Sequence, residues 1–497
     1  MGIIKRQSIK NSLVNYVGVG IGAVSVIFIY PLIDRTELGM IQFAMNTAIL
    51  FASFAALASS MTATKFYPIF RSDDQTDNGF VPLLTASTLT ASLVFIGLIY
   101  LFRLPIAALF QTDAAQFLNS LHFILIFTVC IAVGNLYMSF AANQNRIVVP
   151  SIFQNLLIKI AQPSLVLLYF YGVIKFAEIF KGLALTLFLM VAGLVGYVFF
   201  LRKRSFSPKI LRGGILTKSL GFEMLRFSSF NLLVVLGGLF AQRVDQLLIV
   251  PLLGYEKLAI FSFGFFIAEA IDVPRKALSS IAQPLLSTSI LEKNWAHVAE
   301  IYRKTALLQV VVGVFMLAGI WACADALFDL MPKNGAAFRT GKWVILILGL
   351  SRLADMATGT NAEIITLSDY YRFNFRSFLT MALLNIVLNL LLIPRFGIEG
   401  SAVATLISIA TVNVWRLFFI KKKFNMQPLD WKMVAVVGFG LAAWFITDLT
   451  PSVSQPILTI LLKGLIISVL YGFLILYFKI SPEVNAAFNK VKTTIFK

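Results

Sequence analysis

Residues 182–201 read GLALTLFLMVAGLVGYVFFL, twenty consecutive residues without a charged side chain. A helix of about 20 apolar residues is long enough to cross the ~30 Å hydrocarbon core of a bilayer. Similar runs recur along the 497-residue chain, in which 59% of the residues are hydrophobic and 13% are charged. A soluble protein carries about 25% charged residues. The stretch therefore predicts a membrane-spanning helix, and the composition predicts a polytopic membrane protein.

Fourteen apolar runs are separated by charged or turn-rich segments. Each run favours a helix, because only helices and closed barrels satisfy their backbone hydrogen bonds in lipid, and barrel strands would alternate apolar and polar residues. We therefore expect an all-α fold with about 14 transmembrane helices. The predicted spans are about 11–33, 38–64, 81–102, 118–141, 147–170, 177–200, 227–253, 258–290, 296–325, 343–367, 373–393, 398–420, 431–449 and 456–478.

The connections between the spans carry unequal numbers of lysines and arginines. The connections on one side, which include both ends of the chain, hold 29 of the 42, and those on the other side hold 9. Because positive residues accumulate on the cytoplasmic side, both termini are expected in the cytoplasm. The net charge of +19 then follows from topology, with anionic membrane lipids as its partner, and does not indicate nucleic acid.

Spans 1–6 and 7–12 resemble two copies of one unit. Gly39 in span 2 and Gly254 before span 8 are 215 positions apart, and Gly182 and Gly400 are 218 apart. An even number of spans per copy makes a parallel repeat, whose two lobes can enclose a cleft open to alternate sides. The predicted parts are an N-terminal lobe (1–204), a basic cytoplasmic hinge (205–226), a C-terminal lobe (227–423) and a segment with two further spans (424–497).

Several kinds of chemistry are not indicated. Cys130 and Cys323 lie within apolar runs, and the histidines, His122 and His297, are 175 positions apart, so neither a disulfide framework nor a metal site is predicted. The chain lacks a phosphate-binding loop of the Gly-x-x-x-x-Gly-Lys-Ser/Thr type, so ATP hydrolysis is not expected to drive it. We expect no cofactor.

Charged residues inside the spans mark the candidate site. Each would cost about 2.5–3.5 kcal/mol at the centre of a lipid-exposed helix, so these side chains are expected to face a cavity or one another. The spacing places Arg352, Asp355 and Glu363 on one face of span 10, and Glu269 on one face of span 8 with Asp272 and Lys276. The intramembrane charges of the second lobe are Arg243, Asp245, Glu269, Asp272, Arg352, Asp355 and Glu363. In the first lobe the main one is Lys159.

Three motifs resemble those of the polysaccharide (O-antigen, Wzx-type) flippase family of the multidrug/oligosaccharidyl-lipid/polysaccharide exporter superfamily. They are Arg35-Thr-Glu-Leu-Gly39, Asp245 to Gly254, and Asn385 to Thr405 with its Pro394-Arg-Phe-Gly397-Ile-Glu-Gly400 turn. The resemblance implies a monomeric flippase, not an enzyme, in the bacterial cytoplasmic membrane, which moves a polyprenyl-diphosphate-linked oligosaccharide by alternating access for surface polysaccharide or lipopolysaccharide synthesis. Related lipid II flippases place an arginine where this chain has Glu269, which argues against lipid II as the substrate.

For such a substrate, arginine is the residue that matches phosphate oxygens best. We expect Arg243 and Arg352, with Arg275, Lys276 and Lys159, to attract the diphosphate. A carboxylate in a low-dielectric cavity can exchange a proton near neutral pH, which predicts proton- or sodium-coupled transport. The acids expected to carry the ion are Glu269, Asp245 and Glu363. Glu269 and Glu363 rank above Asp355, because Asp355 lies one turn from Arg352 whereas no cationic partner on the same helix is evident for the two glutamates.

Three alternatives stay open at this point. The buried charges are also explained by structural ion pairs that lock helices together. A cation-coupled multidrug exporter of the same fold would use Asp245, Glu269 and Asp355 for organic cations. A membrane glycosyltransferase or polymerase is disfavoured, because the chain has no sizeable external loop.

Overall fold

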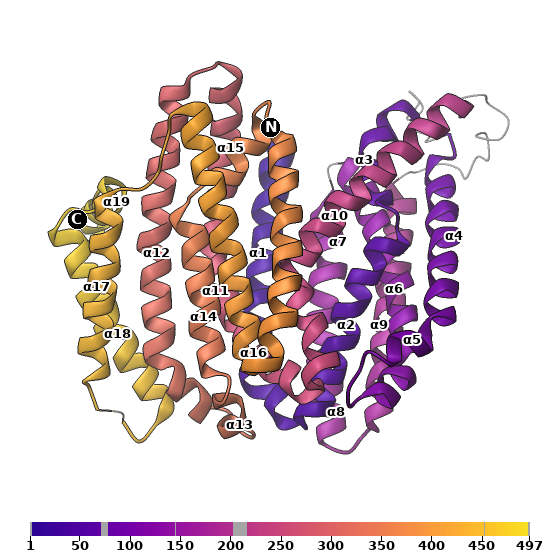
Figure 1. Ribbon diagram of the computed structural model, residues 1–497, viewed down its shortest axis with the longest axis horizontal. Helices are drawn as coiled ribbons and strands as arrows, with labels where there is room; N and C mark the ends of the chain where they lie inside the picture. Colours follow the sequence, from indigo (N-terminus) through magenta and orange to yellow (C-terminus); the bar gives the residue numbers. More distant parts are fainter. Residues whose placement is uncertain (1, 71–77, 145, 202–215, 452, 496–497) are drawn as a thin grey trace. The chain divides into compact units, whose positions relative to one another are not determined.

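The computed structural model describes residues 2–70, 78–144, 146–201, 216–451 and 453–495. Throughout these ranges the chain forms helices joined by turns, without a β-strand (Figure 1). The predicted all-α fold is therefore confirmed. The chain divides into two compact units, Met1–Ala259 and Ile260–Lys497.

The first unit contains the helices up to α10 and the start of α11. They are α1 (Gly2–Val24), the π-helical η1 (Ser25–Ile29), the 3-10 turn η2 (Tyr30–Leu32), α2 (Arg35–Ala55), α3 (Ser59–Phe70), α4 (Phe80–Leu101), α5 (Arg103–Ala107), α6 (Ala114–Asn143), α7 (Val148–Ser151), the π-helical η3 (Ile152–Leu156), α8 (Leu157–Phe170), α9 (Phe176–Leu201) and α10 (Lys218–Leu253).

Helices α2 and α6 form much of the interior of this unit, each with 61% of its most apolar stretch buried. Gly39 of α2 is in contact with the backbone of Tyr255, and a Cβ at Gly39 would collide with the Tyr255 carbonyl oxygen. The Tyr255 ring packs edge-on against Phe43, at 5.6 Å between ring centroids. Only glycine allows this approach, which explains physically why the sequence has a glycine at position 39.

The second unit contains the rest of the chain. Its helices are α11 (Tyr255–Leu291), α12 (Trp295–Asp329), α13 (Gly335–Arg339), α14 (Lys342–Ala357), α15 (Asn361–Leu367), α16 (Tyr371–Phe424), α17 (Trp431–Asp448), α18 (Pro456–Tyr477) and α19 (Pro482–Ile495).

Helix α16 is a helical hairpin whose two limbs run in opposite directions (Figure 1). The turn is at Gly397, whose φ of 61° lies in the left-handed region that glycine adopts without strain. Ser401 donates a hydrogen bond of 2.6 Å to Asn389, twelve residues earlier. In a straight helix these residues would be about 18 Å apart. The Gly397-Ile-Glu-Gly400 motif is therefore the tight turn between two spans.

The number of membrane passages agrees with the sequence. Eleven helices of the described chain are long and apolar enough to cross a membrane, or up to 12 when the bent pair α14–α15 is included. These figures count the α16 hairpin once. They omit α11, which has four charged residues in the stretch from Glu269 to Lys276. With α11 added and both limbs of α16 counted, the described chain provides the fourteen predicted passages.

The predicted lobe boundaries remain a prediction. Residues 205–215 of the proposed hinge lie outside the described residues, and α10 begins at Lys218. The N-terminal part of α10 contacts α3, where Thr62 and Ser228 share a hydrogen bond of 2.6 Å and Lys65 pairs with Glu223 at 3.1 Å. These contacts place α10 in the first compact unit.

Candidate functional site

A network of charged side chains connects α11, α14 and α16 inside the second unit. Helix α11 contributes Glu269, Asp272, Arg275 and Lys276, whose three- and four-residue spacing places them on one side of the helix. Asp272 is 2% exposed. Its carboxylate accepts hydrogen bonds from Arg275 and is 2.9 Å from the ammonium of Lys276. Two cations on its own helix therefore neutralise this buried acid.

Arg275 and Glu269 connect α11 to α14. The guanidinium of Arg275 also lies 3.4 Å from the carboxylate of Asp355. Glu269 pairs with Arg352 at 2.6 Å and with Lys276 at 3.2 Å. A single carboxylate thus holds two cations, one from each helix.

The network continues from Asp355 through amide side chains. Asn413 of α16 donates a hydrogen bond of 2.9 Å to Asp355. The Asn413 oxygen accepts hydrogen bonds from Thr358 at 3.1 Å and from Asn361 at 2.8 Å. Thr358 and Asn361 flank the break between α14 and α15, where Gly359 has a φ of 58° and the helix axis turns by 48°. The amides therefore fix the geometry of a broken span.

Arg416 lies one turn after Asn413 and is only 4% exposed. It donates a hydrogen bond of 3.0 Å to Ser377 on the other limb of α16, and its guanidinium lies 4.6 Å from the ring centroid of Phe378. Asp355 and Glu363 interact with it electrostatically, while one terminal nitrogen is buried without a hydrogen-bond partner. Arg416 therefore holds the hairpin and has one donor unused.

The network is balanced in charge. Its cations are Arg275, Lys276, Arg352 and Arg416, and its acids are Glu269, Asp272, Asp355 and Glu363. Each cation can bind an anionic ligand only by giving up a carboxylate or by using a donor that is still free. Arg352 has such a donor, since its buried Nε lacks a partner. Among the described residues, no group of three or more His, Cys, Asp and Glu side chains is arranged to hold a metal ion.

The structure brings together six of the nine residues that the sequence singled out: Glu269, Arg275, Lys276, Arg352, Asp355 and Glu363. Span 10 is broken after Ala357, where the helix axis turns by 48°. Asp355 and Glu363 nevertheless interact electrostatically with the same cations, Arg275 and Arg416. The expectation that Glu269 has no cationic partner on its own helix is wrong, since Lys276 reaches it across seven residues.

The other three predicted residues belong to the first unit. Arg243 of α10 donates a hydrogen bond of 2.7 Å to Asn46 of α2. Asp245 is 1% exposed. Lys159 of α8 is half-buried and has no hydrogen bond or ion pair to another described residue. The spacing had predicted that Arg243 and Asp245 point in different directions.

Sequence reasoning missed Asn413, Arg416 and Ser377. Arg416 had been counted among the cytoplasmic charges because it stands six residues before Lys422. Asn413 and Arg416 follow each other by three residues, as do Asn374 and Ser377, all within or at the edge of apolar runs. A spacing of three residues places both members of each pair on the same face of a helix. It could therefore have predicted one polar face on each limb of α16.

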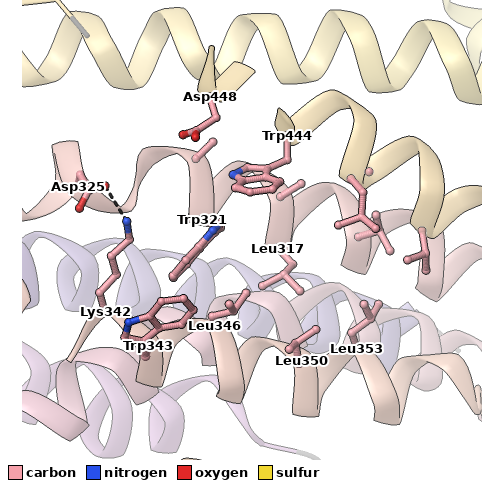
Figure 2. Close-up of a pocket in the computed structure, with 16 residues that line it drawn as sticks. Leu317, Trp321, Asp325, Lys342, Trp343, Leu346, Leu350, Leu353, Trp444 and Asp448 are labelled. Carbon is pink, nitrogen blue, oxygen red and sulfur yellow. Dashed lines mark hydrogen bonds and ion pairs between the residues drawn. The ribbon is translucent and has the colours of Figure 1, made fainter. Parts of the chain in front are cut away.

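The second unit also contains an apolar groove with a volume of 520 Å³ between α12, α14 and α17. Figure 2 shows charged residues and the indoles of Trp321 and Trp343 toward one end, and Leu350 and Leu353 at the other. Lys342 pairs with Asp325 at 2.7 Å at the charged end. The groove shares only α14 with the charged network.

Comparison with solved structures identifies the fold. The lipid II flippase MurJ in an inward closed conformation matches with a TM-score of 0.73 and 14% identity, covering 95% of this chain and 98% of that one. An inward-facing multidrug resistance MATE family transporter of the MOP superfamily matches with a TM-score of 0.61 and 12% identity, covering 82% of this chain and 94% of that one. This chain therefore shares its fold with these two solved structures.

The sequence relatives match only part of the chain. No protein-family model matches the chain. The uncharacterized membrane protein YabM of Bacillus subtilis is 24% identical over 235 residues, which cover 46% of this chain and 43% of YabM. The probable low-salt glycan biosynthesis flippase Agl15 of Haloferax volcanii is 21% identical over 217 residues, covering 43% of this chain and 46% of Agl15. The chain thus matches less than half the length of these relatives.

Proposed function

We propose that the protein is a flippase for a polyprenyl-diphosphate-linked oligosaccharide. The observation that carries this proposal is the position of Glu269, which holds Arg352 of α14 and Lys276 of α11 at 2.6 and 3.2 Å. Two cations that share one carboxylate form a site that a diphosphate can enter by displacing the acid. The MurJ-like fold and the glycan flippase among the relatives support this class of substrate.

Displacement of Glu269 provides a way to couple transport to an ion. When a phosphate oxygen replaces its carboxylate at Arg352 and Lys276, the acid loses its cations in a partly buried site. An uncompensated charge in that environment costs several kcal/mol, so the acid takes up a proton or sodium ion. Release of the diphosphate restores the ion pairs and expels the ion. Substrate and ion therefore bind together and leave together, so this step couples the movement of the one to that of the other.

The other predicted residues keep their proposed roles. Arg275 of the second unit is proposed to attract the diphosphate, and the same role is proposed for Arg243 and Lys159 within the first unit. Asp245, Glu363 and Asp355 are the further candidates for ion coupling. Both termini are proposed to face the cytoplasm of a bacterial cell, with the protein working as a monomer in the cytoplasmic membrane.

Purified protein in proteoliposomes tests the proposal. A fluorescent polyprenyl-diphosphate glycan is incorporated, and its movement is followed by loss of accessibility to a membrane-impermeant quencher. Arg352→Ala and Lys276→Ala are expected to slow transport at least about tenfold, since each removes a charge-assisted bond. Arg395→Ala, an exposed arginine on the α16 turn, is the matched control. Wild-type rates in both variants would contradict the assignment.

A cation-coupled multidrug exporter is the second candidate, favoured by the four carboxylates of the network and by the MATE likeness. The same vesicles distinguish the two functions. Uptake of an organic cation driven by an imposed proton or sodium gradient, without movement of the glycan lipid, would select the exporter. Glu269→Gln separates the coupling step, because flipping by this variant should no longer respond to the gradient.

A further inference from the structure

The apolar groove of the second unit has the length of one leaflet of a bilayer. Its lining extends along α12 from Val314 to Asp325, along α14 from Leu353 to Lys342, and along α17 from Val437 to Asp448. Each stretch covers eleven residue steps, or about 16 Å of helix. This is about half of the ~30 Å hydrocarbon core. The groove therefore fits an acyl chain from one leaflet better than a long polyprenyl chain.

The charged end of the groove has the character of a membrane–water interface. All three helices place their charged groove residue at this end, where Figure 2 shows Asp325, Lys342 and Asp448. Trp321 and Trp343 lie near this end, and tryptophan is enriched at the level of lipid headgroups. Gly440, deeper in the groove, faces Val314 of α12 and leaves no side chain of its own in the groove. The groove is thus open for an alkyl chain beneath a polar mouth.

The charges at the mouth complement a zwitterionic headgroup that carries an amine. Lys342 pairs with Asp325 at 2.7 Å, and its ammonium lies 4.7 Å from the ring centroid of Trp321. Arg339 pairs with Asp329 at 2.5 Å and lies 3.8 Å from Asp325. The third carboxylate near the mouth is Asp448, which is exposed and has no hydrogen bond or ion pair to the described residues. The three acids therefore outnumber the two cations, Lys342 and Arg339, by one.

We infer that this groove binds a phospholipid with a primary-amine headgroup, of the phosphatidylethanolamine type. One acyl chain fills the apolar part between α12, α14 and α17. The phosphate lies near Lys342, and the ammonium donates hydrogen bonds to Asp448. This site is separate from the charged network and does not depend on the proposed flippase activity.

Lipid retention measured by native mass spectrometry tests the inference. The full-length protein is equilibrated in micelles with phosphatidylethanolamine, its N-methylated series ending in phosphatidylcholine, phosphatidylglycerol, or polyprenyl phosphate. We expect phosphatidylethanolamine to be retained about tenfold more than phosphatidylcholine, because the quaternary amine cannot donate a hydrogen bond. Asp448→Asn should reduce the preference about tenfold, whereas Glu399→Gln, which changes an acid on the α16 turn, should leave it unchanged.

Leu350→Trp provides a second readout, since it fills the groove with a larger side chain without altering the charges at the mouth. It should reduce the retention of phosphatidylethanolamine, while the melting temperature in detergent reports whether the fold is intact. Equal retention of the amine and quaternary lipids, or an unchanged preference in Asp448→Asn, would overturn the inference. Preferential retention of polyprenyl phosphate would also overturn it and would assign the groove to an isoprenoid tail.

Discussion

Two buried hydroxyls of helix α6 in the first unit and the carboxylates of helices α11 and α14 in the second have different kinds of partner. In α6, Ser120 and Thr128 donate hydrogen bonds to carbonyls of their own helix, at 2.9 and 2.7 Å. In α11 and α14, Glu269 and Asp355 bind cations on the other helix. A hydroxyl bonded to its own helix requires nothing from its neighbours. An ion pair between helices fixes their positions and holds charges that a ligand can use.

The largest effect is expected from breaking the ion-pair centre of the second unit. Arg275→Ala leaves Asp272 with Lys276 alone and removes the cation beside Asp355. Removing one partner of a buried ion pair costs about 3–5 kcal/mol. The melting temperature of the purified protein should therefore fall well below that of the wild type and of the Arg395→Ala control. An unchanged melting temperature would mean that the network does not stabilise these helices.

A smaller loss is expected in the first unit, where the constraint is steric. Gly39→Ala places a methyl group against the backbone of Tyr255, which cannot move aside as a flexible side chain would. Such overpacking costs about 1–3 kcal/mol. Gly97→Ala in α4 is the matched control, because nothing lies within 4 Å of the added carbon. A melting temperature lower for Gly97→Ala than for Gly39→Ala would refute the close approach of α2 to Tyr255.

The smallest change is expected where a hydroxyl bonds only its own helix. Thr128→Val keeps the shape of the side chain and removes one hydrogen bond to Ile124. Buried polar contacts in membrane proteins contribute about 0.6 kcal/mol on average. The variant should unfold within a degree or two of the wild type and transport at the wild-type rate. A large loss of stability would show that the difference between α6 and α11–α14 is not one of local against inter-helix bonding.

The sequence was sufficient for the spans because lipid imposes a length and a composition on each helix. The runs predicted at 431–449 and 456–478 correspond closely to α17 and α18. The break in the tenth span was missed, because hydropathy does not report that Gly359 adopts a positive φ. Hydropathy also treats residues 371–424 as two apolar runs without showing that their polar faces meet.

The charged residues of the site were found, but most of their partners were not. A charge inside a span is visible in the sequence because it is costly there. Its partner is set by the packing of helices distant in the sequence, so Glu269 with Arg352 and Asp355 with Arg275 were not predicted. Arg416 was misassigned because a cation near a basic cluster resembles a topology signal. Burial of 96% of its surface identifies it as part of the interior.

The central claim is that the diphosphate head of the substrate binds beside Arg352. Phe265 lies at this position, with the Arg352 guanidinium 5.6 Å from its ring centroid. Replacing Phe265 with benzoylphenylalanine places a photoreactive group there, and Phe445 on the exposed face of α17 serves as the control position. Illumination with a radiolabelled polyprenyl-diphosphate glycan should crosslink the glycan at 265, weakly at 445, and no longer at 265 when Arg352→Ala is also present. Equal crosslinking at both positions, or capture at 265 that does not depend on Arg352, would contradict the claim.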